Sequence, residues 1–262
     1  NVQPSTLTPM LIKGIFHIHS NFSYDSEFTL SEIKKALLER GCKFGIICDH
    51  VQEFDSLKYD RMKEECRTQS GTDYIFIPGL EFEFDSIHVL GVDLKEYFQA
   101  DNIEECLGEI KKQWGLAIWA HPNIRDWGVM EEHAESIDGI EVWSARYGTK
   151  YAPSIQLCGR LVDLCRRGRE MYGYAGQDAH RKEQIKKLYI EMETKNIDRE
   201  EILDNLSTGK FRMRFHAFSI PSSADLSWWQ KITFPIIYNG YQFTEKIIDG
   251  LKGKGDRNQK SE

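Results

Sequence analysis

Strand-like apolar runs alternate with helix-like stretches over most of this 262-residue chain. The apolar runs that predict strands are 11–18, 44–48, 74–82, 87–92, 116–120, 139–143, 171–176 and 187–192. Helices are predicted at 29–40, 102–114, 154–168 and 198–207, and Thr29 with Glu32 has the spacing of a capping box. This alternation predicts an α/β fold with a mainly parallel sheet, either a barrel or an open doubly wound sheet.

Several classes of protein are excluded or disfavoured. Neither a G-x-G-x-x-G motif after the first strand nor a G-x-x-x-x-G-K-[ST] motif is present, which argues against dinucleotide and P-loop sites. No apolar run approaches the ~20 residues of a transmembrane helix. The formal charge of −7 disfavours binding to duplex nucleic acid. The N-terminal residues show no signal-peptide pattern, and six cysteines without a C-x-x-C pair favour the cytoplasm.

Histidines and carboxylates fall at the predicted ends of strands. These residues are His17, His19, His50, Glu81, His88, His121, Glu141, Asp178 and His180. We expect each to lie at or just past the C-terminal end of its strand, where ligands and catalytic groups converge in parallel α/β folds. Imidazole and carboxylate ligands without thiolate suit Zn, Mn or Fe, and a set this large indicates more than one ion.

The order of these motifs resembles the PHP (polymerase and histidinol phosphatase) family. The motifs are HIHS with Asp25 eight residues after His17, then DH, GLE, IHVLG, AHP and DAH, within residues 15–180. The resemblance implies a distorted (β/α)7 barrel, similar to a TIM barrel, with a trinuclear metal site that hydrolyses phosphoesters. It implies nine ligands, namely His17, His19, Asp25, His50, Glu81, His88, His121, Asp178 and His180. Glu81 would bridge an ion held by His17, His19 and Asp178 to one held by His88 and His121. The third ion would take Asp25, His50 and His180.

Two positions depart from the family pattern. Cys48 stands where the second motif usually has threonine, and Glu81 is separated from His88 by only a short stretch. The short stretch suggests a relatively open pocket.

The implied mechanism is hydrolysis by a hydroxide that bridges two ions, with Glu81 and Asp178 at the reacting centre. Three divalent ions with Asp25, Glu81 and Asp178 give a local charge of about +3, which attracts phosphate to an acidic protein. A bound divalent ion lowers the pKa of water to about 7, so hydroxide is available at neutral pH. We expect a small phosphorylated metabolite, a nucleotide or histidinol phosphate as the substrate.

Four further residues have two interpretations each. Asp49 either supports a ligand or is a solvated loop carboxylate, and Glu141 either binds a metal or supports a ligand. Arg146 and Arg181, just past strand ends, either hold the substrate phosphate or are ordinary surface charges.

Rival functions are a C–N bond hydrolase of the amidohydrolase type and a non-catalytic PHP-like binding module. No strand end offers a clear lysine for the carboxylated-lysine bridge typical of the former, and the complete ligand set argues against the latter.

We expect a barrel domain at 1–218, an aromatic-rich extension at 219–252 and a disordered tail at 253–262. The extension, with Trp228 and Trp229, either packs on the barrel or touches a membrane or partner.

Overall fold

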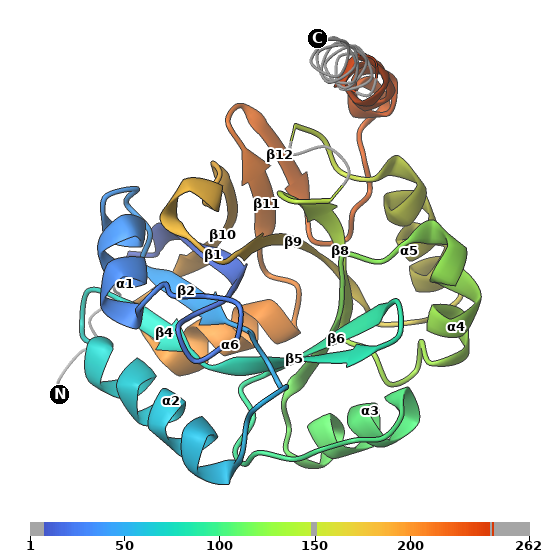
Figure 1. The fold of residues 1–262 in the computed structure, drawn as a ribbon. Helices are drawn as coiled ribbons and strands as arrows, with labels where there is room; N and C mark the ends of the chain where they lie inside the picture. The colour runs from blue at the N-terminus through green and yellow to red at the C-terminus, as the bar shows by residue number, and fades with distance from the viewer. Residues whose placement is uncertain (1–7, 148–150, 242, 244–262) are drawn as a thin grey trace, which may run out of the picture.

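The computed structural model describes residues 8–147, 151–241 and 243. These residues form a mixed α/β fold in which helices surround a large sheet (Figure 1). The strands are β1 (Met10–Ile18), β2 (Phe44–Ile47), β3 (Asp49–His50), β4 (Ile75–Ile77), β5 (Gly79–Phe84), β6 (Ile87–Val92), β7 (Leu116–Ala120), β8 (Gly139–Ser144), β9 (Tyr172–Ala179), β10 (Leu188–Thr194), β11 (Arg212–Phe215) and β12 (Phe218–Pro221). The main helices are α1 (Leu30–Leu38), α2 (Ser56–Gln69), α3 (Ile103–Lys112), α4 (Trp127–Glu132), α5 (Ile155–Arg166), α6 (Arg199–Ser207) and a helix at 228–241.

The predicted helices begin at side chains that satisfy free backbone N–H groups. The Thr29 hydroxyl accepts from the Glu32 N–H, and the Glu32 carboxylate accepts from the Thr29 N–H, so the capping box at α1 is confirmed. Asn102, Ser154 and Asp198 cap α3, α5 and α6 in the same position. The sequence pattern does not predict α2, because only Tyr59, Met62 and Cys66 of its fourteen residues are buried.

Neighbouring strands in the sheet follow the order β12-β11-β10-β1-β9-β8-β7-β6-β5-β3, and β2 pairs with both β1 and β4. This path has two ends, so the sheet is not a closed barrel by its strand pairing. The ladder is interrupted where Cys48 separates β2 from β3 and Pro78 separates β4 from β5. Proline lacks the N–H that a continuous ladder requires, which accounts for the second interruption.

Two parts of the sheet are antiparallel. β10, β11 and β12 extend it antiparallel from β1, and β6 lies antiparallel within the otherwise parallel part. β6 runs antiparallel to both β5 and β7, whereas β7, β8, β9, β1 and β2 pair in parallel. The start of β6 therefore lies at the same edge as the C-terminal ends of the neighbouring strands. This corrects the expectation for His88, which is the second residue of its strand and not near its end.

The C-terminal part of the described chain adds a hairpin and a helix to the sheet. The hairpin β11–β12 extends the sheet from β10, and the expected domain boundary between 218 and 219 falls inside β12. Phe234 of helix 228–241 is fully buried and its ring contacts those of Trp143 and Phe218. Trp228 on the same helix is 77% exposed. Residues 244–252 of the expected extension and the expected disordered tail at 253–262 lie outside the described residues.

Among the helices described, none combines the length and apolar character that a bilayer crossing requires.

Candidate metal centre

The nine predicted ligands lie together at one edge of the sheet. They come from the end of β1 and the loop behind it, from β3, β5 and the start of β6, and from the ends of β7 and β9. Their ligand atoms form three overlapping groups, and within each group all of these atoms lie within 4.8 Å of one another. The groups are His17, His19, Glu81 and Asp178; then Glu81, His88 and His121; and then His19, Asp25, His50 and His180.

Glu81 is the carboxylate shared by two of the groups. Its Oε2 lies 3.0 Å from His17 Nε2 and 3.2 Å from His19 Nε2. Its Oε1 lies 2.7 Å from His88 Nδ1 and 3.2 Å from His121 Nε2. Burial alone would raise the pKa of Glu81, but the charge of His17 and hydrogen bonds from the histidines hold it well below its usual range. The carboxylate therefore stays ionised in the interior.

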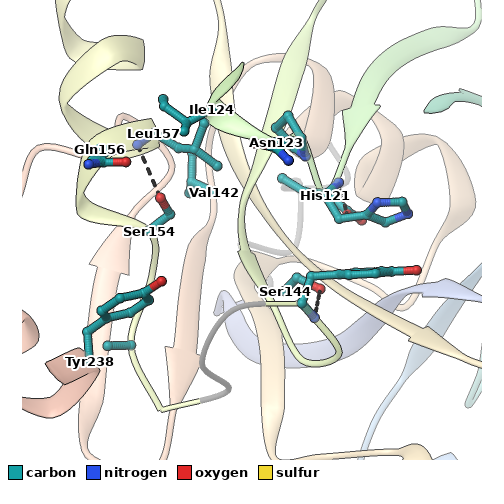
Figure 2. Close-up of a pocket in the computed structure, with 13 residues that line it drawn as sticks. His121, Asn123, Ile124, Val142, Ser144, Ser154, Gln156, Leu157 and Tyr238 are labelled. Atoms are coloured by element: carbon teal, nitrogen blue, oxygen red, sulfur yellow. Dashed lines mark hydrogen bonds between the residues drawn. The ribbon is translucent and has the colours of Figure 1, made fainter. Parts of the chain in front are cut away.

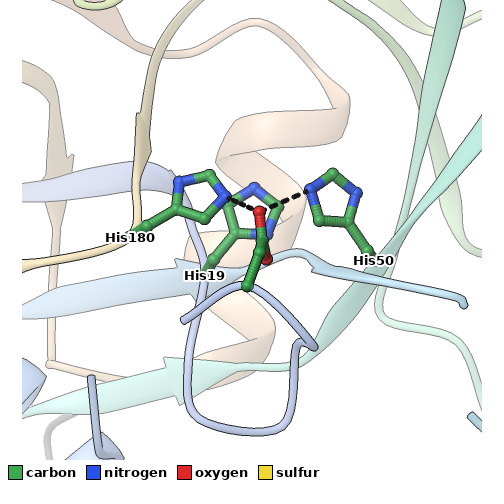
Figure 3. A group of neighbouring side chains, drawn as sticks. His19, His50 and His180 are labelled. Carbon is green, nitrogen blue, oxygen red and sulfur yellow. Dashed lines mark ion pairs between the residues drawn. The ribbon is translucent and has the colours of Figure 1, made fainter. Parts of the chain in front are cut away.

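The third group surrounds the side chain of Asp25. Its Oδ2 lies 2.7 Å from His180 Nε2 and 3.5 Å from His50 Nε2. Figure 3 shows His180 and His50 on opposite sides of the His19 ring. The rings of His19 and His180 stack with centroids 4.0 Å apart.

Protonated histidines balance the negative charge of the carboxylates in these groups. Burial lowers the pKa of His19, but hydrogen bonds to Asp178 and Glu81 outweigh it and raise the pKa to about 9. Burial raises the pKa of Asp178, yet the hydrogen bond from His19 and the charge of His17 bring it far below normal. Imidazole must be deprotonated to bind a metal, so divalent ions would replace these protons.

Three of the nine residues adopt the left-handed backbone conformation. The φ angle is 65° at His17, 28° at His121 and 47° at Asp178. The pairing of β1 with β2 and β9 also shifts register around His17 and Asp178. Such conformations are strained for residues other than glycine, and bulges turn side chains out of the regular alternation. The backbone is therefore bent at the points where side chains enter the groups.

The Glu141 carboxylate accepts hydrogen bonds from two of these histidines. Its Oε1 accepts from His17 Nδ1 at 2.9 Å, and its Oε2 accepts from the His121 backbone N–H at 2.8 Å. In the neutral imidazole that binds a metal, this contact keeps the proton on Nδ1 and presents Nε2 as the ligand, so the geometry favours the supporting role over direct ligation. A Cβ at Gly176 would overlap this carboxylate, which explains the glycine in GQDAH.

Asp49 is fully buried, so it is not a solvated loop carboxylate. Its oxygens accept from the Ser20 N–H and the Ser20 hydroxyl, both at 2.5 Å. Burial raises its pKa to about 6 despite His19 and these hydrogen bonds. Asp49 thus holds the chain directly after His19, and it belongs to none of the three groups.

The two arginines differ in position. Arg146 Nη1 donates to Asp178 Oδ2 at 3.2 Å and to His180 Nδ1 at 3.1 Å, and its side chain remains 45% exposed. Arg181 is exposed and lines a separate cavity with Asp25 and His180. Arg146 therefore reaches the groups directly, and Arg181 lies beside them.

Two further contacts were not predicted from the sequence. Glu83 Oε1 lies 2.7 Å from His50 Nδ1, and the ring of Tyr147 contacts that of His121 with centroids 4.3 Å apart. The two-residue alternation in GLEFEF places Glu83 on the face of Glu81 and was the available signal for it. No local pattern marks Tyr147.

The donor set fits divalent transition metals. It contains six imidazoles and three carboxylates, the ligand types that Zn, Mn and Fe accept. Within the described chain, His19 Nδ1 is buried without a hydrogen-bond partner, whereas His50 Nδ1 and His180 Nε2 face carboxylate oxygens of Glu83 and Asp25. A buried polar atom left unpaired is costly, and bound ions would engage such nitrogens.

A cavity of about 360 Å³ adjoins this centre through His121 and Glu141 (Figure 2). Its walls come from the segment after β7, from β8, from the start of α5 and from helix 228–241, which contributes Tyr238.

No family model and no curated protein sequence matches the chain. Among solved structures, it is similar to a two-domain protein from Bacteroides vulgatus that contains a predicted PHP-like metal-dependent phosphoesterase. The TM-score is 0.65 at 16% identity, over 80% of this chain and 66% of that one. The chain has a PHP-like fold.

The chain is also similar to two other solved structures at lower TM-scores. PsfC from Pseudomonas syringae has a TM-score of 0.55 at 14% identity, over 89% of this chain and 98% of that one. A lesion-specific endonuclease from Pyrococcus furiosus has a TM-score of 0.54 at 18% identity, over 78% of this chain and 58% of that one. The chain thus spans about two thirds or less of the Bacteroides and Pyrococcus proteins.

Proposed function

We propose that this chain is a metal-dependent phosphoester hydrolase that holds up to three divalent ions. The observation that carries the proposal is the meeting of nine imidazole and carboxylate side chains in three groups joined through Glu81 and His19. Zn, Mn or Fe bound there would supply a bridging hydroxide at neutral pH and stabilise negative charge on the phosphoryl oxygens. The overall reaction adds water across a P–O bond and releases an alcohol, together with phosphate from a monoester or a phosphomonoester from a diester.

The chain's own residues have distinct tasks in this proposal. Glu81 and Asp178 stay ionised and set the charge of the reacting centre, while Glu141 orients His17. Arg146 approaches the groups beside Asp178, and its exposed side can donate to oxygens of a bound phosphate. Arg181 would reach only the part of a substrate that extends past Asp25 and His180.

The proposal includes the distorted (β/α)7 barrel. If β2 with β3 and β4 with β5 each count as one interrupted strand, the pairings pass through seven strands and return to β1. We assign this barrel to residues 1–218 and treat 219–252 as an extension of it.

A reducing compartment such as the cytoplasm suits the six cysteines, none of which forms a disulfide in the described chain.

A small substrate is favoured over duplex nucleic acid. The net charge of −7 opposes binding to a polyanion, although one of the similar structures is an endonuclease. An amidohydrolase of the carboxylated-lysine type is disfavoured because the sequence offers no clear lysine at the strand ends that supply the three groups.

A screen of the metal-loaded protein tests this function. The protein, reconstituted separately with Zn, Mn and Fe, is assayed against phosphomonoesters, phosphodiesters and amides. We expect phosphoester hydrolysis that a chelator abolishes and added metal restores, because the ions supply the hydroxide. Turnover of amides without turnover of phosphoesters, or hydrolysis that survives complete metal removal, would contradict the proposal.

A further inference from the structure

The cavity beside His121 carries an inference about the substrate that rests on the proposed function. It shares His121 with the group formed by Glu81, His88 and His121, so a molecule bound at that group borders the cavity directly. Its volume of about 360 Å³ lies within the range of small-molecule sites. Figure 2 shows Tyr238 and Ser154 on the opposite side of the cavity from the His121 ring.

The described residues that line this cavity offer no free charge for a ligand. Among the described residues that form it there is no lysine, arginine or aspartate. Its carboxylate, Glu141, already accepts from His17 Nδ1 and from the His121 N–H through its two oxygens. An ammonium or carboxylate placed against these described residues would lose water without gaining a charged partner among them, which is costly.

Uncharged hydrogen-bonding groups face the cavity instead. Ser144 Oγ accepts from the backbone N–H groups of Arg146 and Tyr147, which leaves its hydroxyl proton to donate. Asn123 uses its Oδ1 to accept from the Arg125 N–H, which leaves its amide NH₂ as a donor. Figure 2 shows the Tyr238 hydroxyl directed toward Ser154, at the cavity wall.

Flat apolar surfaces complete the cavity. Tyr147, held against the His121 ring, and Tyr238 are the aromatic walls, and both rings remain partly exposed. Val142 and Leu157 are buried and form apolar wall between them. Aromatic walls with apolar surface suit the faces of a planar ring, and the hydroxyl and amide groups suit its polar edge.

We propose that this cavity binds the alcohol part of the phosphoester, that this alcohol is an uncharged nucleoside, and that Tyr238 is a specificity-determining residue. Helix 228–241 then completes the substrate site, in addition to packing on the sheet through Phe234. The same lining disfavours esters whose alcohol carries an amine or a carboxylate, such as histidinol phosphate and phosphoserine.

The first test measures binding without turnover. Titration calorimetry with adenosine and with uridine is performed on the metal-loaded wild type and on Tyr238→Ala and Tyr238→Phe. Binding to the wild type should weaken about tenfold in Tyr238→Ala and less in Tyr238→Phe, because the ring supplies most of the contact. Ile236→Ala is the matched control, since Ile236 lies on the same helix, is 66% exposed and does not line the cavity. It should bind as the wild type does.

The second test measures KM and kcat for the 5′-monophosphates of adenosine and uridine, with histidinol phosphate and phosphoserine for comparison. Tyr238→Ala should raise KM for the nucleotides about tenfold with little change in kcat, and the wild type should prefer the nucleotides. Equal kcat/KM for all esters, or nucleoside affinity and KM unchanged in Tyr238→Ala, would overturn the nucleoside site while phosphoester hydrolysis stands. Nucleoside binding that depends on Tyr238 without turnover of any phosphoester would support the site and contradict the proposed function.

Discussion

Replacing Glu81 with glutamine is expected to lower kcat/KM for phosphoester hydrolysis by about a thousandfold. The two oxygens of Glu81 lie within 3.2 Å of nitrogens from four histidines, His17, His19, His88 and His121. Glutamine keeps the size of the side chain but removes its negative charge, and its NH₂ group would face imidazole nitrogens needed as metal ligands. Both groups that share Glu81 would lose their common carboxylate.

The measurement is steady-state kinetics on the best phosphoester of the screen, with circular dichroism to compare the folds. Glu83→Gln is the matched control, because Glu83 lies on the same strand and its carboxylate forms an ion pair with His50. We expect the control to lose about tenfold, the effect of removing a group that supports a ligand. A Glu81→Gln variant that keeps a tenth or more of wild-type activity would refute the bridging role.

Replacing Glu141 with glutamine should weaken metal binding and activity by about 10- to 100-fold. Glu141 accepts hydrogen bonds from His17 Nδ1 and from the His121 N–H, and a glutamine has only one oxygen for these two donors. If the amide NH₂ faces His17, it favours the tautomer that carries its proton on Nε2 and so removes a metal ligand. If the NH₂ faces the His121 N–H, two donors oppose each other.

This prediction is checked by competition for metal with a chelator of known affinity and by activity at saturating metal. Glu135→Gln removes the same charge at a surface position, where Glu135 is 71% exposed and pairs with Arg169, and should bind metal as the wild type does. Metal affinity and activity of Glu141→Gln within twofold of those of the wild type would rule out the positioning role.

The sequence predicts the members of the candidate site better than their surroundings. Alternating strands and helices bring strand ends to one edge of the sheet, so residues from His17 to His180 meet without any local motif that holds them together. The sequence does not reveal that β6 runs antiparallel, because an apolar run has the same composition in either direction. That direction is what brings His88, the second residue of its strand, to this edge.

The supporting contacts depend on tertiary packing and lack a local signal. Glu141 and His17 are 124 residues apart in the sequence and meet only in the folded chain. The sequence around either residue therefore does not show whether the Glu141 carboxylate binds a metal or supports a ligand. Tyr238 approaches the cavity only because Phe234, one helical turn earlier, is buried against the rings of Phe218 and Trp143. The bends at His17, His121 and Asp178 likewise depend on the surrounding sheet, since histidine and aspartate adopt a positive φ more often than most residues but still in only a minority of cases.

The number of metal ions bound per chain is the most direct measurement of the central claim. Elemental analysis of the full chain, after incubation with Zn, Mn or Fe and removal of free metal, is compared between the wild type and Glu81→Gln. The three groups predict about three ions per chain in the wild type with at least one metal, and fewer in Glu81→Gln because two groups share that carboxylate. Binding of about one ion or none by the wild type with every metal would contradict a multinuclear site.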